Sequence, residues 1–104
     1  MPKLGDIVIT RVQFTDREGS KIRPALVLFE EAGNIVIAGI TTNLQMKGIP
    51  IFRNEGAAQD SIIKLNYIFT ITDVAVIKTV FQLNREKKRL VFEEFIKKLG
   101  MLKN

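Results

Sequence analysis

The first 83 residues consist largely of short runs rich in β-branched and aromatic side chains, with polar turns between them. Runs of this kind predict strands, and the Gly, Asn and Asp residues between them predict tight connections. The pattern changes only near residue 84, where apolar residues begin to repeat at helical spacing. The chain is therefore expected to be mainly β, with five or six short strands in a small barrel and one C-terminal helix.

Six runs define the predicted strands. They cover residues 6–14, 24–29, 35–42, 49–52, 60–71 and 74–83. Gly33 and Asn34 predict the turn that joins the second and third strands into a hairpin. Pro50 predicts an edge position for the fourth strand, because proline cannot donate a ladder hydrogen bond.

The helix is expected to begin near Arg85, with Asn84 as its N-cap. Its apolar face is predicted to pack in the core and to cover one open side of the strands. The residues of that face are Val91, Phe95, Leu99 and Leu102, widened by Phe92 and Ile96. The basic run 85–89 is interpreted as a solvated face of the same helix.

Composition narrows the possible chemistry. The 104 residues contain no repeat, low-complexity segment or linker, so one domain over residues 1–104 is expected. Cysteine and histidine are both absent, which excludes disulfides and thiol nucleophiles and argues against structural zinc. No run resembles a signal peptide or a membrane span, so we expect a cytoplasmic protein that does not bind membranes. A net charge of +5 favours polyanionic partners.

The predicted hairpin carries polar groups at one end. Arg23 precedes its first strand, and Thr41, Thr42 and Asn43 close its second. In an antiparallel hairpin the start of one strand lies beside the end of its partner. A cation and hydroxyl donors are therefore expected to meet at one rim of the barrel, where they would suit binding of an anionic substrate.

Several motifs occur in a characteristic order: GDIV at 5–8, RPALVL at 23–28, ITT at 40–42, KGIP at 47–50 and DSIIKLNYI at 60–68. This order resembles the PemK/MazF family of toxin ribonucleases from toxin–antitoxin systems, from Leu4 to about Leu99. The resemblance implies an SH3-like barrel of the CcdB/PemK-like kind, usually a homodimer. It also implies sequence-specific cutting of single-stranded RNA without a metal or another cofactor, leaving 2′,3′-cyclic phosphate and 5′-hydroxyl ends.

The same resemblance implies roles for individual residues. The catalytic arginine and threonine of the family fall on Arg23 and Thr41. Ser20, Asp60 and Ser61 fall where relatives contact RNA, and Thr42 and Asn43 are expected to bind substrate because they share the rim with Thr41.

The proton acceptor for such a reaction is left open by the sequence. Asp16, Glu18 or Asp60 would have to serve, or the reaction would depend on electrostatics and alignment of the attacking hydroxyl. Phe69 stands where many relatives have an arginine. Tyr67 and Phe69 could stack on a base, but core packing is the favoured interpretation of both.

A toxin of this kind implies a cognate antitoxin as partner, with a tail that folds over the RNA groove. Two other functions remain open. One is a non-nuclease member of the same fold that binds protein, as gyrase-poisoning toxins do through their C-terminal helix. The other is a plain nucleic-acid-binding module, for which positive charge would suffice.

Overall fold

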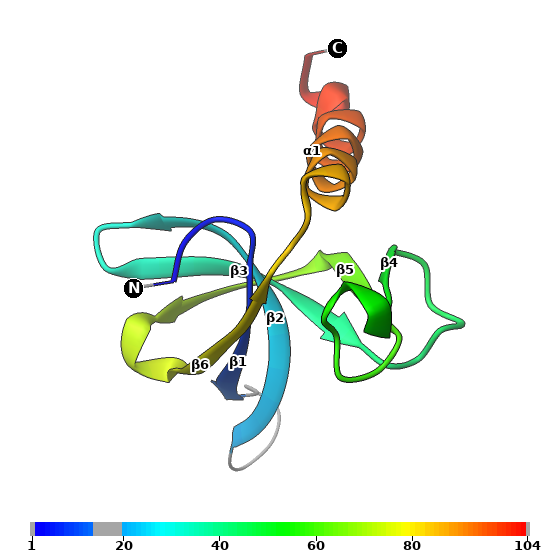
Figure 1. Ribbon diagram of the computed structural model, residues 1–104. Helices are drawn as coiled ribbons and strands as arrows, with labels where there is room; N and C mark the ends of the chain where they lie inside the picture. The colour runs from blue at the N-terminus through cyan, green and yellow to red at the C-terminus, as the bar shows by residue number, and fades with distance from the viewer. Residues whose placement is uncertain (1, 14–19, 104) are drawn as a thin grey trace.

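The protein forms one curled antiparallel sheet with a C-terminal helix (Figure 1). The computed structural model describes residues 2–13 and 20–103. The strands follow the order β4-β5-β3-β2-β1-β6 across the sheet. They are β1 (Asp6–Gln13), β2 (Ser20–Glu31), β3 (Asn34–Thr41), β4 (Ile49–Ile51), β5 (Ser61–Thr72) and β6 (Val76–Gln82); the helix is α1 (Arg85–Leu99). No helix in the described ranges is long and apolar enough to span a membrane.

This architecture confirms the predicted mainly β class with one terminal helix. All six predicted strands are present, and Pro50 lies in β4 at one edge of the sheet. β2 is longer than predicted, because it begins at Ser20 and pairs with β1 from there. A short 3₁₀ turn, Asp73–Ala75, separates β5 from β6 where the sequence divides them.

The turn between β2 and β3 lies one residue earlier than predicted. Glu31 pairs with Asn34, so the two turn residues are Ala32 and Gly33 and not Gly33 and Asn34. Both have positive φ, 52° and 84°, as a two-residue type I′ turn requires. Asn34 is instead the first residue of β3, because this turn matches the register of the two strands.

Both faces of the sheet bury apolar side chains. One cluster includes Leu26, Ile63 and Val91 and contains the contacts with α1. The second includes Val8, Ala25 and Ile37 and lies on the opposite face of the central strands. Ala25 and Leu26 are consecutive in β2 and bury on opposite faces, as the period of two in a strand dictates. Residues of the second cluster, including Ala25 and Ile37, lie on the same face of β2 and β3 as Arg23 and Thr41.

The start of α1 is tied to the β4 edge by polar contacts. Asn84 Oδ1 accepts from Lys87 N at 2.8 Å, which confirms the predicted N-cap, and Asn84 Nδ2 donates to Glu55 Oε1 at 3.1 Å. Lys87 Nζ donates to the Pro50 carbonyl and lies 3.7 Å from Glu55 Oε2. The Lys87 side chain is only 13% exposed. The interpretation of 85–89 as a solvated face is therefore wrong for Lys87, which joins α1 to β4.

The prediction that the whole apolar face of α1 packs in the core is also wrong. Val91 is buried and Phe95 is half-buried, but Phe92, Ile96 and Leu99 are exposed. Leu102 is also exposed and lies beyond α1, in the 3₁₀ turn Gly100–Lys103. Figure 1 shows that α1 rises away from the sheet, with its C-terminal turns beyond the strands, and Phe92 and Leu99 line an open cavity between the helix and the sheet. Helical periodicity identified the apolar face but not how far the sheet extends beneath it.

Gly48, in the KGIP motif, is required by a close backbone approach. A Cβ at this position would lie 2.3 Å from the Ile63 carbonyl oxygen, and a paired strand cannot move aside cheaply. We expect Gly48→Ala to lower the free energy of unfolding by about 2–3 kcal/mol, measured by urea denaturation. Gly100→Ala is the control, because nothing lies within 4 Å of its added Cβ. Equal stability of the two variants would contradict this account of the motif.

Candidate active site

The antiparallel register brings Arg23 and Thr41 together. Ala25 pairs with Gly39, and extending this register by two residues places Arg23 opposite Thr41. The side chains of odd-numbered residues in this part of β2 and β3 share one face of the sheet. Arg23 and Thr41 both line one pocket of about 270 Å³. The two residues that the sequence singled out therefore lie in a single concave site.

The pocket has an apolar floor and one charged side chain among its described lining residues, that of Arg23. Ala25, Ile37 and Gly39 contribute the centre of the floor. Among the described residues that line the pocket, Arg23 is the only charged one, and its side chain is exposed. An arginine beside an apolar surface attracts anions and presents a planar fork that fits two phosphate oxygens.

The hydroxyl of Thr41 is oriented by the chain that follows it. Thr41 Oγ1 accepts a hydrogen bond from Asn43 N at 3.1 Å. Because the oxygen is used as an acceptor, the O–H can donate to a group in the pocket. The strand end thus holds a hydroxyl donor in place in the pocket that Arg23 also lines.

Thr42 and Asn43 are exposed beside this pocket but are not part of its lining. Asn43 Oδ1 accepts from Gln45 N at 3.1 Å, and the Asn43 carbonyl accepts from Met46 N at 3.1 Å. Asn43 therefore shapes the turn after β3. Its contact with substrate, and that of Thr42, stay predictions.

The other predicted RNA contacts lie outside the pocket lining. Asp60 Oδ1 accepts from Arg53 N at 3.0 Å, and Ser61 is buried with its Oγ donating to the Gln59 carbonyl at 2.8 Å. Ser61 is next to Ile62, the β5 partner of Thr41, so its backbone is close to the site although its hydroxyl is used elsewhere. Ser20 is the first residue of β2 and pairs with Gln13. RNA contacts by these three residues stay predictions.

The proton acceptor is still open. Asp16 and Glu18 lie outside the described residues, and Asp60 does not line the pocket. No carboxylate is present among the described lining residues. Nor do three or more Asp, Glu, His or Cys side chains gather anywhere in the described ranges into a group that could hold a metal ion.

Tyr67 and Phe69 also line the pocket, although the sequence favoured core packing for both. Both face the pocket, 42% and 37% exposed, so the favoured prediction of core packing is wrong. The cause is a bulge in β5: Ala38 pairs with Ile68, whereas Gly39 pairs with Lys64, which leaves three extra residues in β5. β4 pairs only with the start of β5, so no described strand pairs with the later half of β5 on that side. Asn66 and Thr70 only flank the run 67–69, so the sequence carried no local signal that these two aromatic side chains face a pocket.

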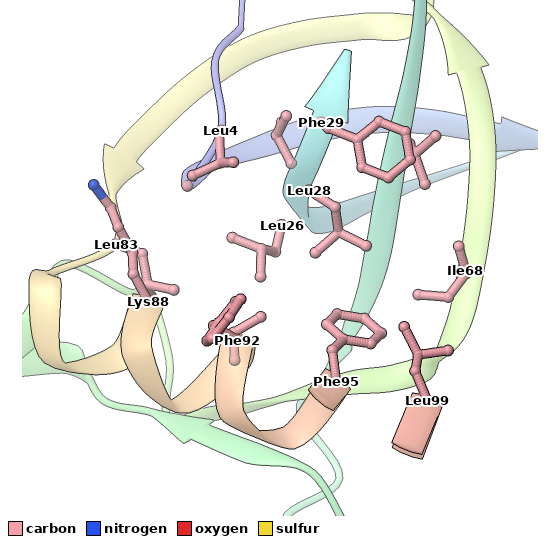
Figure 2. A pocket seen from close by; sticks show the side chains of 14 residues that line it. Leu4, Leu26, Leu28, Phe29, Ile68, Leu83, Lys88, Phe92, Phe95 and Leu99 are labelled. Atoms are coloured by element: carbon pink, nitrogen blue, oxygen red, sulfur yellow. The ribbon is translucent and has the colours of Figure 1, made fainter. Parts of the chain in front are cut away.

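A larger cavity of about 470 Å³ lies between α1 and the sheet (Figure 2). Its walls are almost entirely apolar, with Leu26 and Leu28 from β2 facing Phe92 and Phe95 from α1. Lys88 is the only charged residue in this lining among those described. None of the predicted site residues lines the cavity, and it lacks groups for acid–base or nucleophilic chemistry. The smaller pocket is therefore the candidate active site.

Comparison with known proteins adds independent findings. A family model described as a PemK-like, MazF-like toxin of type II toxin–antitoxin systems matches residues 3–99. No curated protein is significantly similar in sequence.

Solved structures share the fold. The toxin MazF-mt6 of Mycobacterium tuberculosis has a TM-score of 0.69 at 22% identity, over 86% of this chain and 93% of its own. A chain in the MazE–MazF crystal structure from Deinococcus radiodurans has a TM-score of 0.73 at 17% identity, and the match covers 95% of this chain and 96% of that one. An endoribonuclease in complex with its cognate antitoxin, from a mycobacterial species, has a TM-score of 0.70 at 13% identity, and the match covers 96% of each chain.

Proposed function

The chain belongs to the family of PemK-like, MazF-like toxins of type II toxin–antitoxin systems, and on that premise we propose that it is a metal-independent endoribonuclease that cuts single-stranded RNA at preferred sequences. The observation that carries the proposal is the convergence of Arg23 and Thr41 on one pocket. The reaction needs a group that holds a phosphodiester and a donor that stabilises the charge formed on it. In this proposal Arg23 is the first of these groups and Thr41 is the second.

In the proposed reaction the ribose 2′-oxygen attacks the adjacent phosphorus, and the bond from phosphorus to the 5′-oxygen breaks. The 2′-oxygen loses a proton and the leaving 5′-oxygen gains one, which yields a 2′,3′-cyclic phosphate and a 5′-hydroxyl. Negative charge accumulates on the nonbridging oxygens as the new bond forms. Donors held in place before the reaction stabilise that charge without reorganising.

Arg23 would bind two phosphoryl oxygens through its planar fork, and the Thr41 O–H would donate to a nonbridging oxygen. The proton of the 2′-hydroxyl would pass to Asp16, Glu18 or Asp60, or to water. In the last case most of the rate comes from charge stabilisation and from alignment of the attacking oxygen. Ser20, Thr42, Asn43, Asp60 and Ser61 would then bind flanking nucleotides.

The partners follow from the family. We propose that a cognate antitoxin binds and inhibits the protein, since one of its structural neighbours was solved in complex with its cognate antitoxin, and that the active form is a cytoplasmic homodimer. The exposed apolar side chains of α1, which include Phe92 and Ile96, favour a second candidate function. In that alternative the protein binds another protein through the helix, as gyrase-poisoning toxins do, and does not cut RNA.

Cleavage of a mixed single-stranded RNA by the purified protein in EDTA tests the proposal. We expect discrete cuts at a small set of sequences, suppressed by co-expressed antitoxin. If folded protein leaves every RNA intact but blocks DNA supercoiling by gyrase, the protein-binding alternative replaces the nuclease. If RNA is bound and never cut, the chain is a nucleic-acid-binding module.

A further inference from the structure

Two aromatic side chains form one wall of the pocket that contains Arg23. Tyr67 and Phe69 are two residues apart in β5 and point to the same side of the strand. Large aromatic side chains lose favourable burial when they remain exposed. Arg23 is the only cation among the described lining residues of this pocket. Two exposed aromatic rings beside it form a surface suited to a flat, apolar ligand that carries a negative charge.

The surroundings hold Tyr67 in place. Gly39 lies against it, and a Cβ added at Gly39 would be 3.3 Å from the Tyr67 Cβ. Lys64 Nζ lies 5.2 Å from the centroid of the Tyr67 ring and donates to the Lys47 carbonyl at 2.9 Å. Lys64 is itself buried, so this ammonium is anchored. A cation at this distance is attracted by the ring and restricts its motion.

From this geometry we infer that Tyr67 and Phe69 are a stacking platform for one nucleobase of the RNA, next to the phosphate that Arg23 binds. The inference rests on the proposed function and names the part of the substrate that the pocket accepts. At about 270 Å³, the pocket is smaller than the roughly 300–1,000 Å³ of sites for drug-sized ligands. It therefore takes a single base.

The platform reads the base by stacking more than by hydrogen bonding. The floor residues Ala25, Ile37 and Gly39 carry no polar side-chain atoms. Stacking on an aromatic ring is available to every base. This subsite is therefore expected to tolerate different bases and to reject a nucleotide that lacks its base.

A binding measurement tests the platform separately from cleavage. The probe is a single-stranded oligonucleotide of 2′-deoxynucleotides, which lacks the attacking hydroxyl, with the fluorescent base 2-aminopurine at each position in turn. We expect one position at which binding quenches the fluorescence strongly, and loss of that quenching in Tyr67→Leu. Tyr67→Phe should retain it, because the ring remains.

The matched control is Phe52→Leu. Phe52 is 44% exposed and has Lys87 Nζ 5.0 Å from its ring centroid, but it does not line the pocket. Quenching should be the same in this variant as in the wild type. Quenching that survives in the double variant Tyr67→Leu, Phe69→Leu, or the absence of any quenched position, would overturn the platform even if RNA is cut.

If the protein cuts RNA, the cleavage kinetics of wild type and Tyr67→Leu can be compared on substrates with and without the stacked base. Tyr67→Leu should lower kcat/KM about 10- to 100-fold on the complete substrate, the range expected for one lost base–aromatic stack. On a substrate without the base at the quenched position, wild type and Tyr67→Leu should differ by less than about threefold, because the stack is already missing. An equal loss on both substrates would assign Tyr67 a merely structural role.

Discussion

Replacing Arg23 with alanine is expected to lower kcat/KM for RNA cleavage by at least about 10²–10³-fold, the usual cost of removing one donor to a developing oxyanion. Arg23 supplies the only charge among the described lining residues of the pocket, so no described neighbour there can replace it. Its side chain is exposed, and the variant should therefore fold as the wild type does. Single-turnover cleavage, with circular dichroism as the test of folding, measures the effect.

The matched control for Arg23 is Lys21→Ala. Lys21 is exposed on the same strand and the same face, two residues earlier, and does not line the pocket. Its loss should cost only the small electrostatic contribution of one surface charge. Arg23→Lys should remain far below wild type, because an ammonium cannot hold two phosphoryl oxygens in a plane. Full activity in Arg23→Lys would refute the bidentate role.

Replacing Thr41 with valine is expected to lower kcat/KM by about 10²-fold, with little change in KM. Valine keeps the β-branched shape that suits the end of β3 but removes the O–H. It also removes the acceptor for Asn43 N, so the turn after the strand loses one hydrogen bond. Single-turnover rates at saturating RNA isolate the chemical step.

Thr41→Ser separates the two consequences, since serine retains the hydroxyl and should restore most of the rate. Thr42→Val is a further comparison at saturating RNA, where loss of its proposed contact with a flanking nucleotide does not lower the rate, because Thr42 is adjacent and exposed but is not part of the pocket lining. Comparable losses in Thr41→Val and Thr42→Val would show that the turn, and not the Thr41 hydroxyl, determines activity.

Local rules predicted the strands of this fold because their residues have strong β propensity and are separated by clear turns. The same rules placed Arg23 and Thr41 at one rim, since antiparallel pairing of two adjacent strands leaves few alternatives. They missed the true turn residues, Ala32 and Gly33, because a non-glycine residue with positive φ is uncommon.

Features that depend on the whole sheet could not be predicted in this way. The exposure of Tyr67 and Phe69 follows from a three-residue bulge and from the shortness of β4, and neither has a local sequence signature. The partial burial of α1 depends on where the strands end beneath it. The contacts of Lys87 with Pro50 and Glu55 join segments more than 30 residues apart. The local sequence of residues 85–89 therefore predicted only a charged helix face.

The central claim is that the Arg23–Thr41 pocket cuts RNA by attack of the neighbouring 2′-hydroxyl. The most direct test uses two RNA oligonucleotides that contain the preferred cleavage sequence, one of them with a single 2′-deoxy substitution at the nucleotide 5′ to the cut, both in EDTA. The account predicts cleavage of the all-ribose strand to a 2′,3′-cyclic phosphate and a 5′-hydroxyl, and no cleavage of its deoxy counterpart. Cutting of the deoxy strand at the same bond, or 5′-phosphate ends on the products, would contradict it.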